Sequence, residues 1–387
     1  MGFCVFDTKL DRWPISISDI FCILGTRPEA VKMAPVIHAL RDQPWARVTV
    51  VSTGQHRDMI GQMLGIFGIR PDRELEVMQP GQSLAELTAR ILQQLDPVLA
   101  EQQPALVLAQ GDTTTVLASA MASFYRRIPF GHVEAGLRTH DPGYPFPEEF
   151  NRVLAARIAA IHFAPSMGAR ANLLREGIAP GLIHVTGNPV IDALLDVAAR
   201  PEPALPYPSQ PGRRMILLTM HRRENTGENL RNICQAICAL HARFPDVEFV
   251  YPMHPNPALR QVVQPMLGSL GRVHLIEAVD YPRMTGLLKN CHLVLTDSGG
   301  LQEEAPALGK PVLVLRAETE RPELVEAGFV RLIGTQTDTI LEAVSRFLDD
   351  PAAGGGFARG TSPYGDGKAG PRIAQLCGVF LGQLAAD

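Results

Sequence analysis

The sequence lacks the features that would place it in several large protein classes. No apolar run approaches the roughly 20 residues of a membrane-spanning helix, and Asp7, Lys9, Asp11 and Arg12 interrupt any signal-peptide core near the start. The net charge of -4 gives no electrostatic reason to expect nucleic acid or an anionic membrane as a partner. We therefore expect a cytoplasmic protein that binds neither nucleic acid nor membrane.

Signatures of metal sites and redox cofactors are also missing. The six cysteines show no CxxC spacing and join no histidine cluster, so we expect reduced thiols and no metal. No GxGxxG follows an expected strand, because GGGFARG (354–360) has the wrong spacing. The segment ALGKPV (307–312) lacks the rest of a P-loop. We therefore expect no cofactor.

The sequence does contain a repeated alternation of short apolar runs and helical patterns. In the first half, strands are expected at 20–24, 47–52, 105–109 and 128–133, with helical segments such as 83–102 between them. Five prolines between residues 200 and 212 are typical of a linker. The alternation then restarts, with strands expected at 215–220, 247–253, 272–276, 292–296 and 311–315.

This alternation predicts a particular α/β architecture. Parallel strands joined by helices form doubly wound sheets, and two such units in tandem give two Rossmann-like domains that face each other across a cleft. Ligands of such sheets bind at the C-terminal ends of the strands. The expected divisions are an N-terminal extension (1–18), a first domain (19–200), a linker (201–212), a second domain (213–370) and a C-terminal helix (371–387) that can pack back on the first domain.

Features suited to phosphate stand at strand ends in both halves. In ILGTRPEAVK (23–32), Arg27 and Lys32 lie near a helix start, which suits an anion, although two solvated bases would give the same pattern. In the second half a strand ends at Asp297, and Ser298, Gly299 and Gly300 then open a helix whose backbone N–H groups can cradle phosphate. One turn on, Glu304 can accept ribose hydroxyls, and Arg321 follows the next strand.

Acidic residues gather at the strand ends of the first half. Asp112 directly follows one strand, Glu134 follows the next, and Glu148 comes later in a turn-rich segment. Carboxylates that converge on one edge of a sheet are costly unless they bind a cation or their pKa values separate, and separated pKa values are what proton transfer uses. A helix cap at Asp112 and a scatter of surface acids remain the alternatives.

Two histidines take similar places in the second half. His221 follows a strand and suits either proton transfer or hydrogen bonding to phosphate, unless it is a structural histidine. His254 has the same placement after the next strand. Together, phosphate-binding features on both walls of a cleft and an acid cluster on one wall suit an enzyme that acts on a nucleotide sugar.

At these residues the sequence resembles the non-hydrolysing UDP-N-acetylglucosamine 2-epimerases of bacteria. The resemblance runs from about residue 20 to 380 and rests on blocks in family order: GTRPEAVKMAP, TGQHRDM, QGDTTTVLA, GHVEAGLRT, PEEFNR, HRREN, TDSGGLQEEAP, GKPVLVLRAETERPE and SPYGDGKA. It implies the glycosyltransferase-B fold. The implied reaction is reversible C2 epimerisation of UDP-N-acetylglucosamine to UDP-N-acetylmannosamine, through anti elimination of UDP, a 2-acetamidoglucal intermediate and re-addition, for surface polysaccharide synthesis.

The resemblance also implies roles for individual residues. Proton transfer would fall to Asp112, Glu134 and Glu148, and His221 would stand near the diphosphate or assist the leaving group. Substrate would be held by Arg27, Lys32, Ser298, Gly299, Gly300, Glu304 and Arg321. A second molecule of UDP-N-acetylglucosamine would bind at Gln55, Arg222 and His254 as an activator, and the protein would be a homodimer. Asp141 and Glu149 would be ordinary loop acids.

Some features depart from the family, and other functions stay open. Val279 and Met284 stand where the family often has Gln and Phe near the uracil, so those two side chains are not available here for base contacts. The rival functions are a glycosyltransferase of the same fold, a hydrolysing epimerase, a 2-epimerase of a more decorated UDP sugar, and a catalytically dead UDP-sugar sensor.

Overall fold

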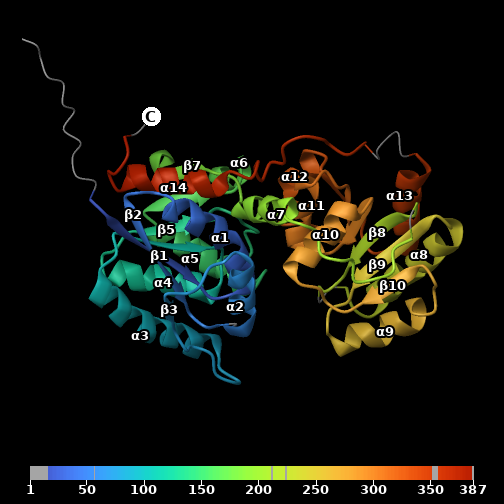
Figure 1. Ribbon diagram of the computed structural model, residues 1–387, viewed down its shortest axis with the longest axis horizontal. Coiled ribbons are helices and arrows are strands. Elements are labelled where there is room, and N and C mark those ends of the chain that lie inside the picture. The colour runs from blue at the N-terminus through green and yellow to red at the C-terminus, as the bar shows by residue number, and fades with distance from the viewer. Residues whose placement is uncertain (1–15, 56, 211, 223–224, 351–355, 386–387) are drawn as a thin grey trace, which may run out of the picture.

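Two parallel sheets form the framework of the protein, as the computed structural model shows (Figure 1). The structure describes residues 16–385 apart from 56, 211, 223–224 and 351–355. The first sheet has the order β3-β2-β1-β4-β5-β6-β7 and the second β10-β9-β8-β11-β12-β13. The strands of the first sheet are β1 (Ser18–Leu24), β2 (Ala46–Ser52), β3 (Arg73–Glu74), β4 (Leu106–Gln110), β5 (Phe130–Val133), β6 (Ile161–Ala164) and β7 (Ile183–Val185). Those of the second are β8 (Arg214–Thr219), β9 (Val247–Pro252), β10 (Val273–Ile276), β11 (Leu293–Thr296), β12 (Val312–Val314) and β13 (Val330–Leu332).

Helices connect successive strands and cover the sheets. In the first half they are α1 (Arg27–Arg41), α2 (Arg57–Ile66), α3 (Leu84–Gln102), α4 (Thr114–Tyr125), α5 (Glu148–Ile158), α6 (Met167–Arg175), the short 3-10 helix η1 (Pro180–Leu182) and α7 (Pro189–Ala199). In the second half they are α8 (Glu228–Arg243), α9 (Pro257–Leu267), α10 (Tyr281–Asn290), α11 (Gly299–Ala307), α12 (Pro322–Glu326), α13 (Thr337–Asp349) and α14 (Ala369–Phe380).

The predicted doubly wound architecture is confirmed, because every strand pair of both sheets is parallel. Strands covered on both faces have continuous apolar sequences, and each expected strand lies within two residues of an observed one. The sequence analysis missed β3, β6, β7 and β13, which have only two to four residues each. The domain boundaries stay predictions, although β1 begins at Ser18, inside the predicted extension; residues 1–15 lie outside the described part.

The chain passes between the two domains twice. The described residues of the segment 201–212 form no helix or strand. After the second sheet, the chain returns and α14 packs against α1, as Figure 1 shows. Asp192 on α7 accepts hydrogen bonds from the backbone N–H groups of Ala369 and Gly370, at 3.1 and 2.8 Å, and so caps α14. A Cβ at Gly370 would lie 2.7 Å from the Pro35 carbonyl oxygen, so only glycine allows this close packing.

Within the described residues, none of the helices combines the length and apolar character that crossing a bilayer would require. The same part of the chain contains no group of three or more histidine, cysteine, aspartate and glutamate side chains arranged to hold a metal ion.

Two buried histidines lie side by side in the first sheet. His132 on β5 pairs in register with His162 on β6, and both are fully buried. His132 Nε2 lies 2.7 Å from the Gly111 carbonyl oxygen, whereas within the described residues neither ring nitrogen of His162 has a hydrogen-bond partner. Burial lowers the pKa of His132 to about 4 and that of His162 to about 3, so both rings are neutral at physiological pH.

These histidines predict a loss of stability in mild acid. The unfolded chain binds a proton on each histidine near pH 6.5, but the folded chain does so only near pH 3 to 4. The free energy of unfolding therefore falls between those values, by about 1.4 kcal/mol per pH unit for each histidine. We expect His162→Leu to reduce this slope between pH 7 and 5, measured by urea unfolding. The exposed His140, replaced by Asn, serves as the control, and an unchanged slope in His162→Leu would contradict the account.

Candidate active site at the domain interface

The predicted acids of the first domain come together at one edge of its sheet. Asp112 follows β4, Glu134 directly follows the neighbouring strand β5, and Glu148 is the first residue of α5. Burial raises the pKa of Asp112 to about 6; Arg152 and Lys32 oppose this shift, and Glu134 and Glu148 add to it. Thr113, not Asp112, caps α4, so the alternative of a simple helix cap at Asp112 is excluded.

Glu134 is the most tightly held of the three acids. Its carboxylate accepts hydrogen bonds from Lys32 Nζ at 2.5 Å, from Asn188 Nδ2 at 2.9 Å and from Gln110. Burial alone would raise the pKa of Glu134, but Lys32 and, to a lesser degree, Arg321 and Asn188 hold it below its ordinary value. Its backbone has a φ of +64°, a left-handed conformation that is uncommon for residues with a side chain and often marks functional sites.

Glu149 is not the ordinary loop acid that we expected. It is buried and accepts hydrogen bonds from the backbone N–H groups of Thr139 and His140, at 3.1 and 3.0 Å. It also accepts one from Arg152 Nε at 2.6 Å, while Arg152 Nη1 lies 3.3 Å from Asp112. Glu149 thus orders the loop before α5 and holds a cation beside Asp112. Asp141 does behave as a loop acid, because it is exposed and accepts a bond from the Gly143 N–H in a turn.

A further buried acid, Glu29, fixes the loops that carry these groups. It accepts hydrogen bonds from the N–H groups of Gly25 and Thr26 at the start of α1, and from the Thr113 hydroxyl at 2.6 Å. Burial raises the pKa of Glu29 to about 7. A Cβ at Gly25 would lie 2.1 Å from Thr115 Oγ1, so the turn after β1 packs directly against the start of α4.

In the second domain, the side chain of Arg321 lies against the glycine turn that begins α11. Ser298 is the N-cap of α11, but its side chain makes no capping hydrogen bond among the described residues. A Cβ at Gly299 would lie 2.7 Å from Arg321 Nη1, so glycine lets the guanidinium lie directly at the helix start. Gly300, the next residue, is exposed. A helix N-terminus with an adjacent guanidinium attracts phosphate.

Glu304 lies deeper, on the same helix. It is 8% exposed and accepts a hydrogen bond from the Tyr281 hydroxyl at 3.0 Å. Burial raises its pKa to about 7, and Lys32 and Arg27 of the first domain are among the charges that oppose the shift. Residues predicted for opposite walls of the cleft are therefore close enough to interact, with Arg27 itself exposed at the start of α1.

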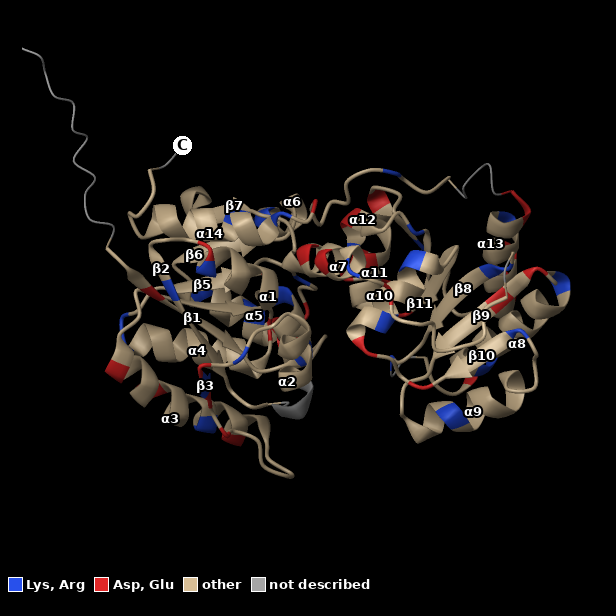
Figure 2. Cartoon of the chain, viewed as in Figure 1, with Lys and Arg blue, Asp and Glu red and all other residues tan. Residues whose placement is uncertain are grey.

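Asn188, at the N-cap of α7, joins the two walls directly. Its side-chain amide donates to Glu134 Oε1 at 2.9 Å and to Glu303 Oε2 of the second domain at 2.7 Å. Glu303 also accepts a hydrogen bond from Arg321 Nε. Acidic and basic residues from both domains accordingly meet where α7 and α11 approach α1 (Figure 2). Sequence reasoning missed Asn188 and Glu303, although Glu303 stands next to Glu304 in QEEAP.

His221 is held by a buried acid at the end of β11. Its Nδ1 lies 3.1 Å from Asp297 Oδ1, and Asp297 also accepts from the backbone N–H groups of His221 and Arg222 and from Asn225 Nδ2. Burial would raise the pKa of Asp297, but these partners hold it below its ordinary value. The ionised Asp297 directs the proton of a neutral imidazole to Nδ1, which leaves Nε2 for a ligand.

Two of the three residues predicted for a second site lie next to His221. The His254 ring is stacked 6.4 Å from that of His221, and Arg222 Nη1 lies 3.3 Å from Glu320. Gln55 belongs to the first domain, where it accepts a hydrogen bond from the Thr115 hydroxyl at 3.0 Å. Among the described residues, the structure records no interaction that links Gln55 to Arg222 or His254.

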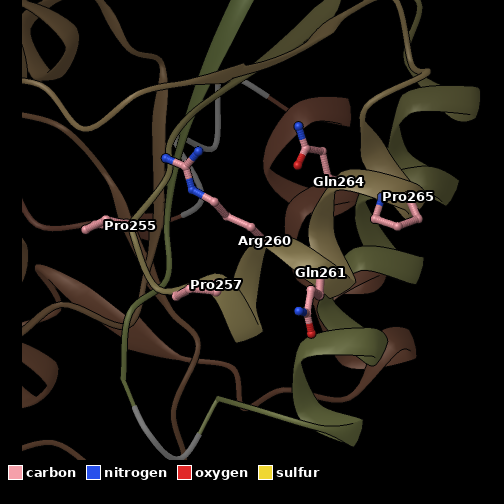
Figure 3. A pocket seen from close by; sticks show the side chains of 6 residues that line it. All are labelled: Pro255, Pro257, Arg260, Gln261, Gln264 and Pro265. Carbon is pink, nitrogen blue, oxygen red and sulfur yellow. The ribbon is translucent and has the colours of Figure 1, made fainter.

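The region predicted for the uracil base is less distinctive. Val279 and Met284 are partly buried and pack against the apolar core of the second domain. A surface depression on the same domain lies beside α9, lined by Pro255, Pro257, Arg260, Gln261, Gln264 and Pro265 (Figure 3). It contains none of the predicted site residues.

Comparison with known proteins assigns the chain to a family. The family model described as UDP-N-acetylglucosamine 2-epimerase matches residues 38–378. The chain belongs to the UDP-N-acetylglucosamine 2-epimerase family. The epimerase of Escherichia coli K12 is 49% identical over 365 residues, which cover 92% of this chain and 97% of that protein. The family predicted from the sequence blocks is therefore confirmed.

Solved structures of epimerases share the fold over nearly the whole chain. The Neisseria meningitidis epimerase bound to UDP-GlcNAc is 43% identical, with a TM-score of 0.85, and the match covers 93% of this chain and 99% of that one. The Methanocaldococcus jannaschii epimerase in complex with UDP-GlcNAc and UDP is 34% identical, with a TM-score of 0.75, and the match covers 93% of this chain and 99% of that one. The predicted glycosyltransferase-B fold of the epimerase is confirmed by these matches.

Proposed function

We propose that this epimerase interconverts UDP-N-acetylglucosamine and UDP-N-acetylmannosamine by elimination and re-addition of UDP. The C2 hydrogen is weakly acidic because no carbonyl stabilises a carbanion there. A base takes the C2 proton, the C2–H electrons form a C1=C2 double bond, and the C1–O bond breaks as UDP departs. Return of UDP to C1, with a proton added to the other face of C2, completes the change. The observation that best supports this proposal is that hydrogen bonds through Asn188 and Glu303 connect Glu134 to Arg321.

The residues divide the work according to their place in the cleft. Asp112, Glu134 and Glu148 handle the proton at C2, and His221, oriented by Asp297, stabilises the departing diphosphate. The α11 N-terminus and the nearby cations hold the diphosphate, and Glu304 holds the ribose. The substrate-binding set is Arg27, Lys32, Ser298, Gly299, Gly300, Glu304 and Arg321. No cofactor takes part in this scheme.

One experiment tests this function: incubation with UDP-N-acetylglucosamine in D₂O, followed by NMR. We expect deuterium at C2, because the abstracted proton exchanges with solvent, and UDP-N-acetylmannosamine as the minor species. A trace of free UDP and glycal should accumulate over long times. Sugar that stays unlabelled and unepimerised in the presence of folded protein would overturn the proposal.

The same spectra separate the rival functions. A hydrolysing epimerase would accumulate UDP and free N-acetylmannosamine to completion. A glycosyltransferase without its acceptor and a dead sensor would both leave C2 protonated. If nothing happens to this substrate, a more decorated UDP sugar becomes the next one to test.

We also propose that a second UDP-N-acetylglucosamine molecule activates the enzyme at Gln55, Arg222 and His254. The support is the stacking of His254 on His221, which would place a second ligand against the catalytic one. Rates should rise sigmoidally with UDP-N-acetylglucosamine, and the reverse reaction should stay slow until a trace of that sugar is added. Hyperbolic kinetics in both directions would exclude this activation.

The proposed setting is a cytoplasmic homodimer that supplies N-acetylmannosamine for surface polysaccharide synthesis. Sedimentation velocity tests the oligomeric state, and a mass of one chain at micromolar concentration would exclude the dimer. Fractionation of cells tests the location, and recovery outside the cytoplasmic fraction would exclude it.

A further inference from the structure

Each of the two innermost cations of the site is already paired with a buried carboxylate. Lys32 Nζ lies 2.5 Å from Glu134 Oε1, and Arg321 Nε donates to Glu303 Oε1. Glu134 is 7% exposed and Glu303 is 1% exposed. Both pairs are therefore largely shielded from water. The attraction between opposite charges is stronger in such a buried environment than in water.

Asn188 links these pairs into one network across the domain interface. A single amide nitrogen donates to both carboxylates, and Asn188 is fully buried between them. We call Lys32, Glu134, Asn188, Glu303 and Arg321 the charge bridge. Its formal charges balance, with two cations and two anions, and Asn188 adds the two N–H donors that separate the carboxylates.

A diphosphate that enters this network upsets its balance. The proposed function places the diphosphate at the α11 N-terminus, where Arg321 already lies against Gly299. Glu303 is on the same helix and bonds to the same guanidinium, so its charge repels the incoming anion and competes for Arg321. A buried carboxylate that loses its counter-ion is strongly destabilised, because water no longer solvates its charge. Glu303 therefore has to change its position or its hydrogen-bond partners when Arg321 binds the diphosphate.

We propose that Glu303 is an internal counter-anion that pairs with Arg321 while the cleft is empty and releases it to the diphosphate. Because Asn188 donates to both Glu303 and Glu134, this release also changes the hydrogen bonding of Glu134. The inference rests on the proposed function, because it needs a nucleoside diphosphate in the cleft. It gives Glu303 the role of a positioning residue. The arrival of the leaving group is thereby coupled to the carboxylate that handles the C2 proton.

The test compares Glu303→Gln with the wild type in two measurements. Binding of UDP alone, by calorimetry, should become about tenfold tighter, because the competing charge is gone while the amide oxygen still accepts from Arg321. The kcat for epimerisation should fall by about 10- to 100-fold, because Asn188 loses its charged anchor and no longer fixes Glu134. Tighter binding with slower turnover is a combination that a merely structural role would not produce.

Matched variants complete the test. Glu303→Asp keeps the charge and should keep a UDP affinity near that of the wild type, and Glu326→Gln removes an exposed charge from α12 and should change neither quantity. Thermal unfolding verifies that each variant is folded. If Glu303→Gln fails to fold, the effect on kcat is measured with Asn188→Ser instead.

Each of the following outcomes would overturn one part of the proposal. Weaker or unchanged UDP binding in Glu303→Gln would overturn the competition for Arg321. Tighter binding with unchanged kcat in Glu303→Gln, or an unchanged kcat in Asn188→Ser, would overturn the coupling to Glu134. If wild-type protein does not bind UDP at all, the proposed function fails instead, so the two failures are distinguishable.

Discussion

Replacing Asp112 by asparagine should lower kcat by about 10²- to 10⁴-fold, the range for loss of a general acid or base. Burial places the pKa of Asp112 at about 6, so both protonation states are accessible near neutral pH. Asparagine has the same shape and can keep the contact with Arg152, but its amide can neither donate nor take up a proton as an acid or base near neutral pH. The affinity for UDP should change little, since the proposed function assigns Asp112 to the proton at C2 and not to the diphosphate.

The measurements are the initial rate of epimerisation by NMR and the Kd for UDP by calorimetry. The control is Asp141→Asn, which removes an exposed acid from the loop before α5 and should keep nearly the full rate. A rate close to wild type in Asp112→Asn would remove this residue from the mechanism. Loss of UDP binding as well would instead indicate a damaged cleft.

Replacing Glu134 by glutamine should also lower kcat by about 10²- to 10⁴-fold, but with a different effect on UDP. Glutamine can still accept from Lys32 and Asn188, so the side chain stays in place while its basicity is lost. Lys32 then loses its buried counter-ion and becomes a better partner for the diphosphate. We therefore expect UDP to bind with equal or higher affinity.

The two quantities are measured as for Asp112, with Glu101→Gln as the matched control, because Glu101 is an exposed acid on the last turn of α3 and has no role in the proposed function. A near wild-type rate would exclude Glu134 from proton transfer. A large loss of UDP affinity would show that the carboxylate supports the diphosphate site rather than competing with it.

The first-domain acids were predictable because sheet geometry acts locally. Asp112 and Glu134 each follow the end of a strand, and β4 and β5 are neighbours, so the parallel arrangement alone brings the two carboxylates to one edge. The choice between Glu148 and Glu149 was not predictable in this way. Adjacent residues of an α-helix point about 100° apart, and which one faces inward depends on the rotation of α5, which the preceding loop sets.

The hydrogen bond between Asn188 and Glu303 could not be predicted from any local sequence pattern. These residues are 115 positions apart and belong to different domains, so their contact depends on how the two domains face each other. The same holds for Ser166, whose hydroxyl donates to Glu323 of the second domain at 2.5 Å. The short strands β6 and β7 were missed for another reason: with four and three residues, and a histidine in each, they carry too little apolar signal.

The return of α14 to the first domain has a consequence for biosynthesis. Ile373, Ala374 and Cys377 of this helix join the same apolar core as Ile37 and Trp45, so that core lacks part of its cover until the end of the chain has left the ribosome. The domain that is translated first is thus the last to be completed, and the second domain can form as an uninterrupted unit while the first still exposes apolar surface. Such surface invites aggregation, so a nascent chain of this enzyme that stalls before residue 369 should depend on chaperones far more than the released one.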